Sequence, residues 1–176
     1  LVIPSIAILG LDTYAVRLPS VVFGIISVIA VYFLVKELFL RFNTKNKWLN
    51  TEVLALFSAF FLAISPWAIQ FSRIAYEANV GVTLNILLVL FFLKGLRNPP
   101  LLFLSAVFGA LAIYAYQSEK VFVPLLVLLL ITIYRKDFFV VRKKYVISAI
   151  LLGLVLLSPM LMYLYDNSAA LLRVTA

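Results

Sequence analysis

The sequence is dominated by long, unbroken runs of apolar residues, and polar positions gather in short stretches between them. The runs do not alternate with the period of two that is typical of a membrane β-strand. A run of about 20 apolar residues crosses a bilayer as an α-helix. The pattern therefore predicts an all-α, polytopic transmembrane helix bundle with about six spans. The expected spans cover residues 20–40, 53–71, 74–96, 101–117, 120–134 and 145–165.

Two of the predicted spans are shorter than the other four. Segments 101–117 and 120–134 fall below the length that about 30 Å of hydrocarbon requires. A thinner bilayer, or burial inside a larger bundle, would accommodate them. A re-entrant hairpin formed by this pair is the alternative to two crossings.

Composition supports a lipid environment and narrows the available chemistry. Hydrophobic residues make up 65% of the 176 residues and charged residues 12%, against about 45–50% and about 25% in soluble domains. The chain has no cysteine and no histidine, which excludes disulfides, thiolate metal sites and an imidazole base. We therefore assign no metal ligand and identify no cofactor, and the need for a divalent metal stays open. Any general base must be one of the 7 acidic residues.

The positive charges indicate which side of the membrane each connection occupies. Eleven of the 15 Lys and Arg residues lie in or beside the connections 41–52, 94–100 and 135–144. The positive-inside rule places these connections in the cytoplasm. The net charge of +8 then reflects topology and attraction to anionic lipid. No platform of interleaved aromatic and basic residues accompanies the charge, so we expect no nucleic-acid partner.

Proline positions indicate where the bundle is irregular. Five of the 7 prolines lie near the predicted outer ends of the spans, and Ser-Pro pairs at 65–66 and 158–159 occupy similar places in two spans. Proline breaks or kinks a helix, and irregular backbone at membrane depth is tolerated where it lines a wet cavity. We therefore expect a cavity in the outer half of the bundle.

The first group of candidate site residues follows Pro66. Arg73 and Glu77 are four residues apart and would meet on one face of a continuous helix. Asn79 continues the polar character into the next span, where polar groups usually face the bundle interior. The alternative is a structural ion pair beside interfacial aromatic anchors, and the sequence gives the two interpretations about equal weight.

The remaining candidates lie at three other predicted outer segments. Tyr116, Glu119 and Lys120 combine a stacking surface with a cation suited to phosphate, although a plain aromatic belt is the more usual explanation. Arg17 precedes the first predicted span, where Pro19 would fit a first helical turn, and together they would suit an anion. The simpler explanation is an arginine that reaches the headgroups. Asp166 and Arg173, after the last span, are equally ambiguous.

Taken in order, these segments resemble a known family. The run comprises YAVRLPS at 14–20, AISPW at 63–67, FSR at 71–73, EAN at 77–79 and AYQSEKVFVP at 115–124, followed by Pro159 and Arg173. It is similar to the bacterial branch of glycosyltransferase family 39, which resembles protein O-mannosyltransferases and the aminoarabinose transferases of lipid A. The similarity covers nearly the whole chain and rests on the order of the segments and the topology together.

The resemblance implies the GT-C fold, a sugar donor on a polyprenyl phosphate, and inversion at the sugar carbon at the outer face. It also implies that Arg17 supports the donor phosphate or the fold. The catalytic acidic residue of the family lies in the first large outer loop, after the first membrane helix. In this chain that loop would precede Leu1, and Asp12 lies too close to the Arg17 motif to match this residue. We therefore expect residues 1–176 to be part of one transmembrane glycosyltransferase domain, truncated at both ends and inactive alone.

The expected partners are membrane lipid, a polyprenyl-phosphate sugar donor and an acceptor that the sequence does not specify, whether protein, lipid or glycan. The expected location is the plasma membrane of a bacterium or archaeon, which the chain crosses several times. A transporter or a non-catalytic membrane scaffold is the alternative, because broken helices and polar outer halves also occur in transporters. Against it, most spans lack a central charge and no inverted repeat is visible.

Overall fold

The computed structural model describes residues 2–41, 50–74 and 76–166, and within these ranges it contains helices and no strand. The predicted all-α class is confirmed. The elements are α1 (Val2–Leu9), α2 (Thr13–Arg41), α3 (Thr51–Ile64), α4 (Pro66–Arg73), α5 (Glu77–Gly95), the 3₁₀ turn η1 (Pro99–Leu101), α6 (Leu102–Ala115), α7 (Glu119–Ile133), α8 (Arg135–Val140) and α9 (Lys143–Asp166).

Local sequence explains where several helices begin and end. Gly10 adopts a φ of 78° directly after α1, a left-handed conformation that commonly ends a helix because glycine lacks a Cβ. Asn50 caps α3 by accepting a hydrogen bond of 3.0 Å from the backbone amide of Glu52. Ser65 is extended and Pro66 begins α4, so the chain bends by 55° between α3 and α4.

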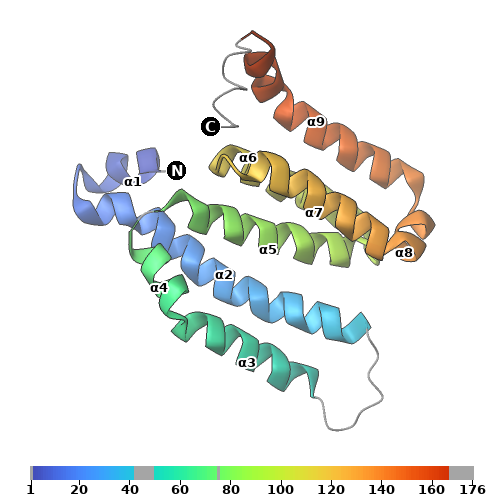
Figure 1. The fold of residues 1–176 in the computed structure, drawn as a ribbon, viewed down its shortest axis with the longest axis horizontal. Coiled ribbons are helices and arrows are strands. Elements are labelled where there is room, and N and C mark those ends of the chain that lie inside the picture. The colour runs from blue at the N-terminus through green and yellow to red at the C-terminus, as the bar shows by residue number, and fades with distance from the viewer. Residues whose placement is uncertain (1, 42–49, 75, 167–176) are drawn as a thin grey trace.

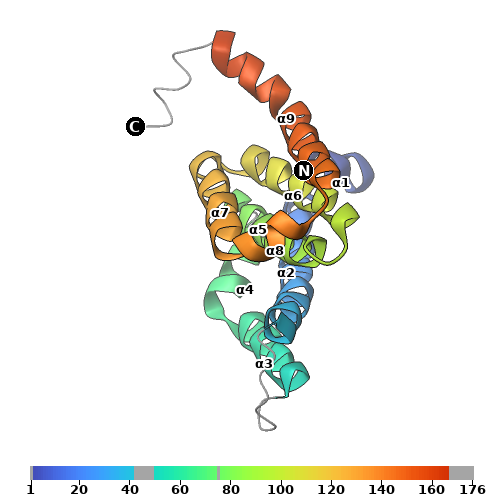
Figure 2. The ribbon, with the colours of Figure 1, turned by 90° about the vertical axis from the view of Figure 1, so that its right-hand side faces the viewer.

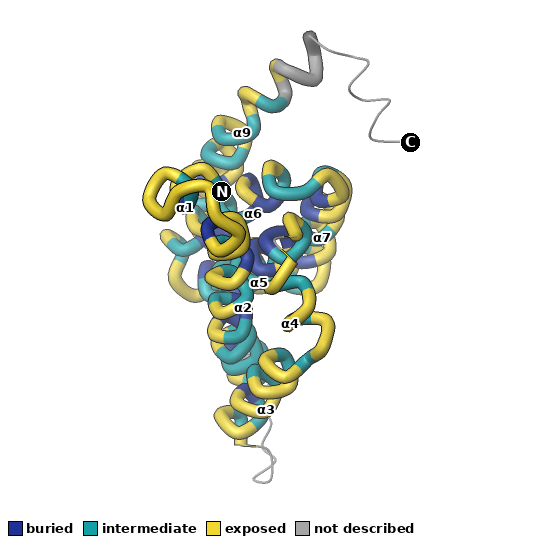
Figure 3. The backbone as a smooth tube through the Cα atoms, turned by 90° about the vertical axis from the view of Figure 1, so that its left-hand side faces the viewer, coloured by how far each residue is buried: buried dark blue, intermediate teal, exposed yellow. Residues whose placement is uncertain are grey.

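Helix α5 is the centre of the bundle. It lies between α2 and α6, while α3 packs on the far side of α2 and α9 on α6 (Figure 1). Among the described helices, α5 carries the largest share of the buried residues, and it lies within the dark blue core in Figure 3. The largest fully buried side chains, Leu88, Leu93 and Thr83, all belong to it.

Small residues allow the helices around α5 to approach closely. A Cβ on Gly109 of α6 would lie 3.0 Å from the Leu88 side chain, and the Ser105 hydroxyl donates a 3.0 Å hydrogen bond to the Leu88 carbonyl oxygen. Between α2 and α4, a Cβ on Gly24 would lie 2.9 Å from the Ser72 Cβ. Small interfacial residues of this kind are typical of helices packed in lipid.

The lengths of the helices bear on the number of spans. Within the part of the chain that the structure describes, three helices, α2, α5 and α9, are long and apolar enough to cross a membrane, and the bent pair α3–α4 would make four. Helices α6 and α7 have 14 and 15 residues, fewer than the about 20 that a simple span needs. Each of the six predicted segments is largely helical, but the count of six crossings stays a prediction.

One local expectation at the start of α2 was wrong. The helix begins at Thr13, so Arg17 and Pro19 lie inside it and not ahead of its first turn. The helix begins early because Asp12 precedes it, with a carboxylate oxygen that accepts a 2.6 Å hydrogen bond from the Thr13 amide. A negative charge at this position stabilises a helix N-terminus.

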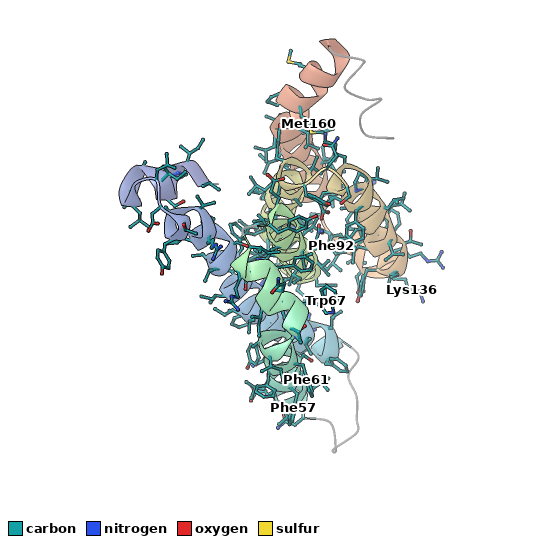
Figure 4. The ribbon with its side chains drawn as sticks, turned by 60° about the vertical axis from the view of Figure 1, so that its left-hand side comes forward. Phe57, Phe61, Trp67, Phe92, Lys136 and Met160 are labelled. Carbon is teal, nitrogen blue, oxygen red and sulfur yellow. The ribbon has the colours of Figure 1, made fainter. Side chains whose placement is uncertain are left out.

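The outside of the bundle is apolar. Phe57 and Phe61 of α3 are 55% and 63% exposed and stack on each other, with ring centroids 6.4 Å apart. In Figure 4 they lie well away from Phe92, which is inside the bundle. Of the described side chains of α9 only Ala149 is buried, and this helix leans away from the other elements (Figure 2). Such extensive exposed apolar surface fits a protein in lipid and not one in water.

The two ends of the bundle differ in charge. At one end, which we call the basic end, Lys36 pairs with Glu52 at 2.8 Å and Arg97 with Glu37 at 3.7 Å. Lys94, also at this end, lies 5.3 Å from the centroid of a phenylalanine ring on α2. The opposite end carries the N-termini of α2, α5 and α7 and the C-terminus of α6 (Figure 1). We call it the polar end, because it holds most of the candidate site residues.

Candidate functional site

A set of side-chain hydrogen bonds joins α2, α4 and α5 at the polar end. The Asn79 amide nitrogen donates to the Ser20 carbonyl oxygen at 2.9 Å and to the Ser20 hydroxyl at 3.2 Å. The Ser20 hydroxyl in turn donates to the Phe71 carbonyl oxygen at 3.1 Å. Thr83, one turn further along α5, donates to the carbonyl oxygens of Phe23 and Asn79. These contacts fix the position of α2 relative to α4 and α5, which lie 51 and 59 positions from Ser20 at the bonded residues.

A second polar contact joins α5 to α7. The Asn85 amide nitrogen donates a 2.8 Å hydrogen bond to a carboxylate oxygen of Glu119. Glu119 is buried, with only 6% of its surface exposed. A Cβ on Gly81, one turn before Asn85, would lie 2.8 Å from the other carboxylate oxygen. A side chain at position 81 would therefore force the Glu119 carboxylate to shift from this position.

A pocket of about 370 Å³ opens at the polar end between α1, α2, α5 and α6. Its lining is mainly apolar, but it includes the carboxylate side chain of Glu77 and the rings of Tyr76 and Tyr114. Pro19 and Ser20 contribute from α2. Apolar walls with a few polar groups are typical of small-molecule sites, and the pocket lies at the end of the bundle that the sequence predicts to be the outer one.

Four aromatic rings form a row beside the pocket. The ring centroids of Trp67 and Phe71 are 6.1 Å apart, those of Phe71 and Tyr76 5.5 Å, and those of Tyr76 and Tyr116 6.2 Å. Trp67, at the outer end of the row, is 73% exposed (Figure 4). A hydrogen bond with the Tyr76 hydroxyl raises the pKa of the Tyr116 phenol. The row therefore continues from α4 to the turn between α6 and α7.

The expected pairing of Arg73 with Glu77 does not occur. Helix α4 ends at Arg73, Ile74 leaves regular helical geometry with φ −95° and ψ 12°, and Tyr76 is extended before α5 begins. The two residues therefore belong to different helices, and within the described part of the chain no ion pair joins them. Both are exposed, and of the two only Glu77 is among the residues that line the pocket.

The other predicted residues have different surroundings. Arg17 is exposed on α2, between Val16 and Pro19, which both line the pocket. Lys120 donates a 2.8 Å hydrogen bond to the Gln117 side chain. Asp166 ends α9, but its side chain lies outside the described part of the structure, and so does all of Arg173.

Sequence reasoning missed three contributors to this end of the molecule. Ser20 and Gly81 carry no obvious chemical signal, and Tyr114, although it stands close to Tyr116 in the sequence, was not among the candidates. A usable signal did exist on α5, because Gly81 and Asn85 are four residues apart and share a helix face. Their partner Glu119 lies 34 positions further along the chain, so the sequence alone could not identify it.

The arrangement supplies acceptors, stacking surfaces and a cation, and the described residues contain no group of three or more acidic side chains placed to hold a metal. Comparison with known protein families shows which family the chain belongs to. The profile of the dolichyl-phosphate-mannose-protein mannosyltransferase family matches residues 4–163. The chain belongs to this family.

The transferase is thus a membrane protein of the GT-C glycosyltransferase type, in a family whose sugar donors are lipid-linked. Membership supports the transferase interpretation over a transporter or a scaffold. No curated protein and no solved structure matches the chain in the same comparisons.

Proposed function

We propose that this transferase moves a sugar from a polyprenyl-phosphate donor to a protein, lipid or glycan acceptor, and that the pocket at the polar end holds the donor sugar. The observation that carries the proposal is the position of that pocket. It combines Glu77, Tyr76 and Tyr114 with Val16 and Pro19 of α2, residues on either side of the exposed Arg17. The match of the chain to the family covers residues 4–163.

Each part of such a donor has a matching feature at this end. Arg17 is suited to the phosphate, because a guanidinium forms charge-assisted, bidentate hydrogen bonds with phosphate oxygens. The tyrosine rings offer flat surfaces to a sugar ring, and the Glu77 carboxylate accepts hydrogen bonds from sugar hydroxyls. The polyprenyl chain remains in the surrounding lipid, against the apolar outer surface of the helices.

The distribution of charge supports an outer location for the site. Most Lys and Arg residues lie at the basic end or in the connections that adjoin it, and the positive-inside rule places that end in the cytoplasm. The pocket is at the opposite end. An outer site also agrees with the family resemblance, in which the active site faces away from the cytoplasm.

The proposed reaction inverts the configuration of the sugar carbon. The acceptor oxygen forms a bond to that carbon as its bond to the phosphate oxygen breaks, and a carboxylate takes the acceptor proton. The leaving polyprenyl phosphate carries the negative charge, which Arg17 stabilises. We assign Glu77 to sugar binding, because it lines the pocket beside the rings of Tyr76 and Tyr114, and we assign no residue as the proton acceptor.

The proposal is tested by comparing three single variants in the purified protein at its natural length. Arg17→Gln should weaken binding of a polyprenyl-phosphate sugar about ten- to a hundredfold, which corresponds to losing a charge-assisted hydrogen bond of about 1.5–3 kcal/mol. Glu77→Gln should lower transfer through a higher KM for the donor. Arg73→Gln is the matched control, since Arg73 is exposed on a neighbouring helix and does not line the pocket.

Near-normal donor binding and transfer in both Arg17→Gln and Glu77→Gln would contradict this assignment of the pocket. An equal loss in all three variants would also contradict it, because a general effect of surface charge would then explain the result.

A further inference from the structure

A second cavity, of about 590 Å³, lies on the other side of α6. Its walls come from α5, α6, α7, α8 and α9, and its only polar side chains are the hydroxyls of Ser105 and Thr132. Its volume is within the range of about 300–1,000 Å³ that ligand sites occupy. An elongated apolar ligand fits such a groove, whereas a sugar or nucleotide would find almost no hydrogen-bond partners in it.

The groove reaches the basic end of the bundle. Phe138 of α8 and Val146 of α9 belong to its lining, and Lys143 and Lys144 lie within one turn of Val146 on α9. The Lys144 ammonium lies 4.9 Å from the centroid of the Tyr145 ring. The segment 135–144 contains five cations and one acid, and the cations are all exposed. They are Arg135, Lys136, Arg142, Lys143 and Lys144.

We propose that this groove binds an anionic glycerophospholipid, with an acyl chain between α6, α7 and α9 and the headgroup phosphate on the cations of segment 135–144. Basic pockets between membrane helices recognise anionic headgroups in this way. Charge complementarity selects the occupant, because a zwitterionic lipid would fill the apolar groove equally well but would gain less from five neighbouring cations. The site is separate from the donor pocket and does not depend on the identity of the sugar.

The donor itself is a poorer fit to the groove. At the polar end of the groove the lining comes from Val123, Pro124 and Leu157, which are apolar. One cation, Lys120, lies within a turn of Val123, and its ammonium group is already hydrogen-bonded to Gln117. A polyprenyl phosphate entering from that end would meet one cation of the described lining helices, whereas an anionic lipid entering from the basic end meets five.

Native mass spectrometry of the protein with phosphatidylglycerol or phosphatidylcholine tests the proposal. The wild-type protein should retain phosphatidylglycerol preferentially. Neutralising Lys143 and Lys144 together with glutamine should weaken phosphatidylglycerol binding about 25-fold, at about fivefold for each cation, and leave phosphatidylcholine unchanged. Neutralising Lys45 and Lys47 in the same way is the charge control, because they belong to the predicted connection 41–52.

A second variant probes the groove and not the charge. A Cβ on Gly153 would meet only Ala106, at 4.0 Å, so Gly153→Leu should place its side chain in the groove without a backbone clash and displace the acyl chain. Val155→Leu is the control, since Val155 is 65% exposed and does not line the groove. Equal retention of both lipids by the wild type would overturn the proposal. Displacement of phosphatidylglycerol by equimolar polyprenyl phosphate would also overturn it, by assigning the groove to the donor.

Discussion

The contact between Asn85 and Glu119 offers a quantitative test of how the polar end is held together. The hydrogen bond is 2.8 Å long and links α5 to the first residue of α7. Because Glu119 is only 6% exposed, water cannot readily replace Asn85 when the amide is removed. Asn85→Ala should therefore destabilise the protein by more than the loss of one exposed hydrogen bond.

Two reference values bound the size of the effect. A hydrogen bond to a charged group contributes about 1.5–3 kcal/mol in soluble proteins. Hydrogen bonds between membrane helices average about 0.6 kcal/mol in double-mutant cycles, with a maximum of about 1.7. The lower range applies to the coupling energy between Asn85 and Glu119 in a double-mutant cycle, because polar side chains of the unfolded chain in a membrane also form hydrogen bonds. We expect Asn85→Ala alone to cost about 1–3 kcal/mol, since it leaves a buried carboxylate without its donor.

The assay is reversible unfolding in mixed micelles, measured for Asn85→Ala, Glu119→Ala and the double variant. The expected coupling energy is about 0.6–1.7 kcal/mol, so the double variant should be more stable than the sum of the single effects indicates. Asn98→Ala serves as an exposed control and should change stability by no more than about 0.5 kcal/mol. A coupling energy below about 0.3–0.5 kcal/mol, the range of simple additivity, would refute the reasoning.

Three further predictions concern orientation, packing and ionisation. Because the chain has no cysteine, single cysteines at the exposed positions Asn98 and Ser118 should label from opposite sides of the membrane, and labelling from one side would contradict the proposed topology. Leu88→Ala should lower the free energy of unfolding by about 2–5 kcal/mol, since Leu88 is 1% exposed. Unfolding in micelles measures this loss, and a loss near zero would contradict the description of Leu88 as a core residue. Tyr76→Phe should lower the pKa of Tyr116 toward its usual value of about 10, because the Tyr76 hydrogen bond raises it; ultraviolet titration of the phenolate measures this, and an unchanged pKa would contradict the cause. The raised pKa means that the contact stabilises the fold at lower pH and that this stabilisation is lost as the pH rises through the pKa of Tyr116.

Periodicity and composition were sufficient for the helical class and for the break at Pro66, whereas the position of the site stays a prediction. These features depend on neighbours in the sequence, and the physical rules that govern them are local. The pairing of Arg73 with Glu77 failed for an equally local reason, because it assumed a continuous helix. Helix α4 begins at Pro66 and ends after eight residues, at Arg73. A separation of four residues therefore does not place Arg73 and Glu77 on one helix face.

The contacts that define the site depend on the packing of distant segments. Ser20 and Asn79 are 59 positions apart, and Asn85 and Glu119 are 34 apart. Each contact depends on which faces of α2, α5 and α7 meet, and in lipid the hydrophobic pattern does not specify those faces. An apolar side chain can face either lipid or another helix at little difference in free energy, as the exposed phenylalanines of α3 illustrate.

The measurement that tests the central claim most directly is transfer of a labelled sugar by the purified protein at its natural length. It should be offered the same sugar on a polyprenyl phosphate and on a nucleotide, with a mixture of protein, lipid and glycan acceptors. We predict incorporation from the polyprenyl phosphate alone, reduced by Arg17→Gln and retained by Arg73→Gln. Transfer from the nucleotide sugar without any polyprenyl phosphate, or transfer that is unaffected by Arg17→Gln, would contradict the account.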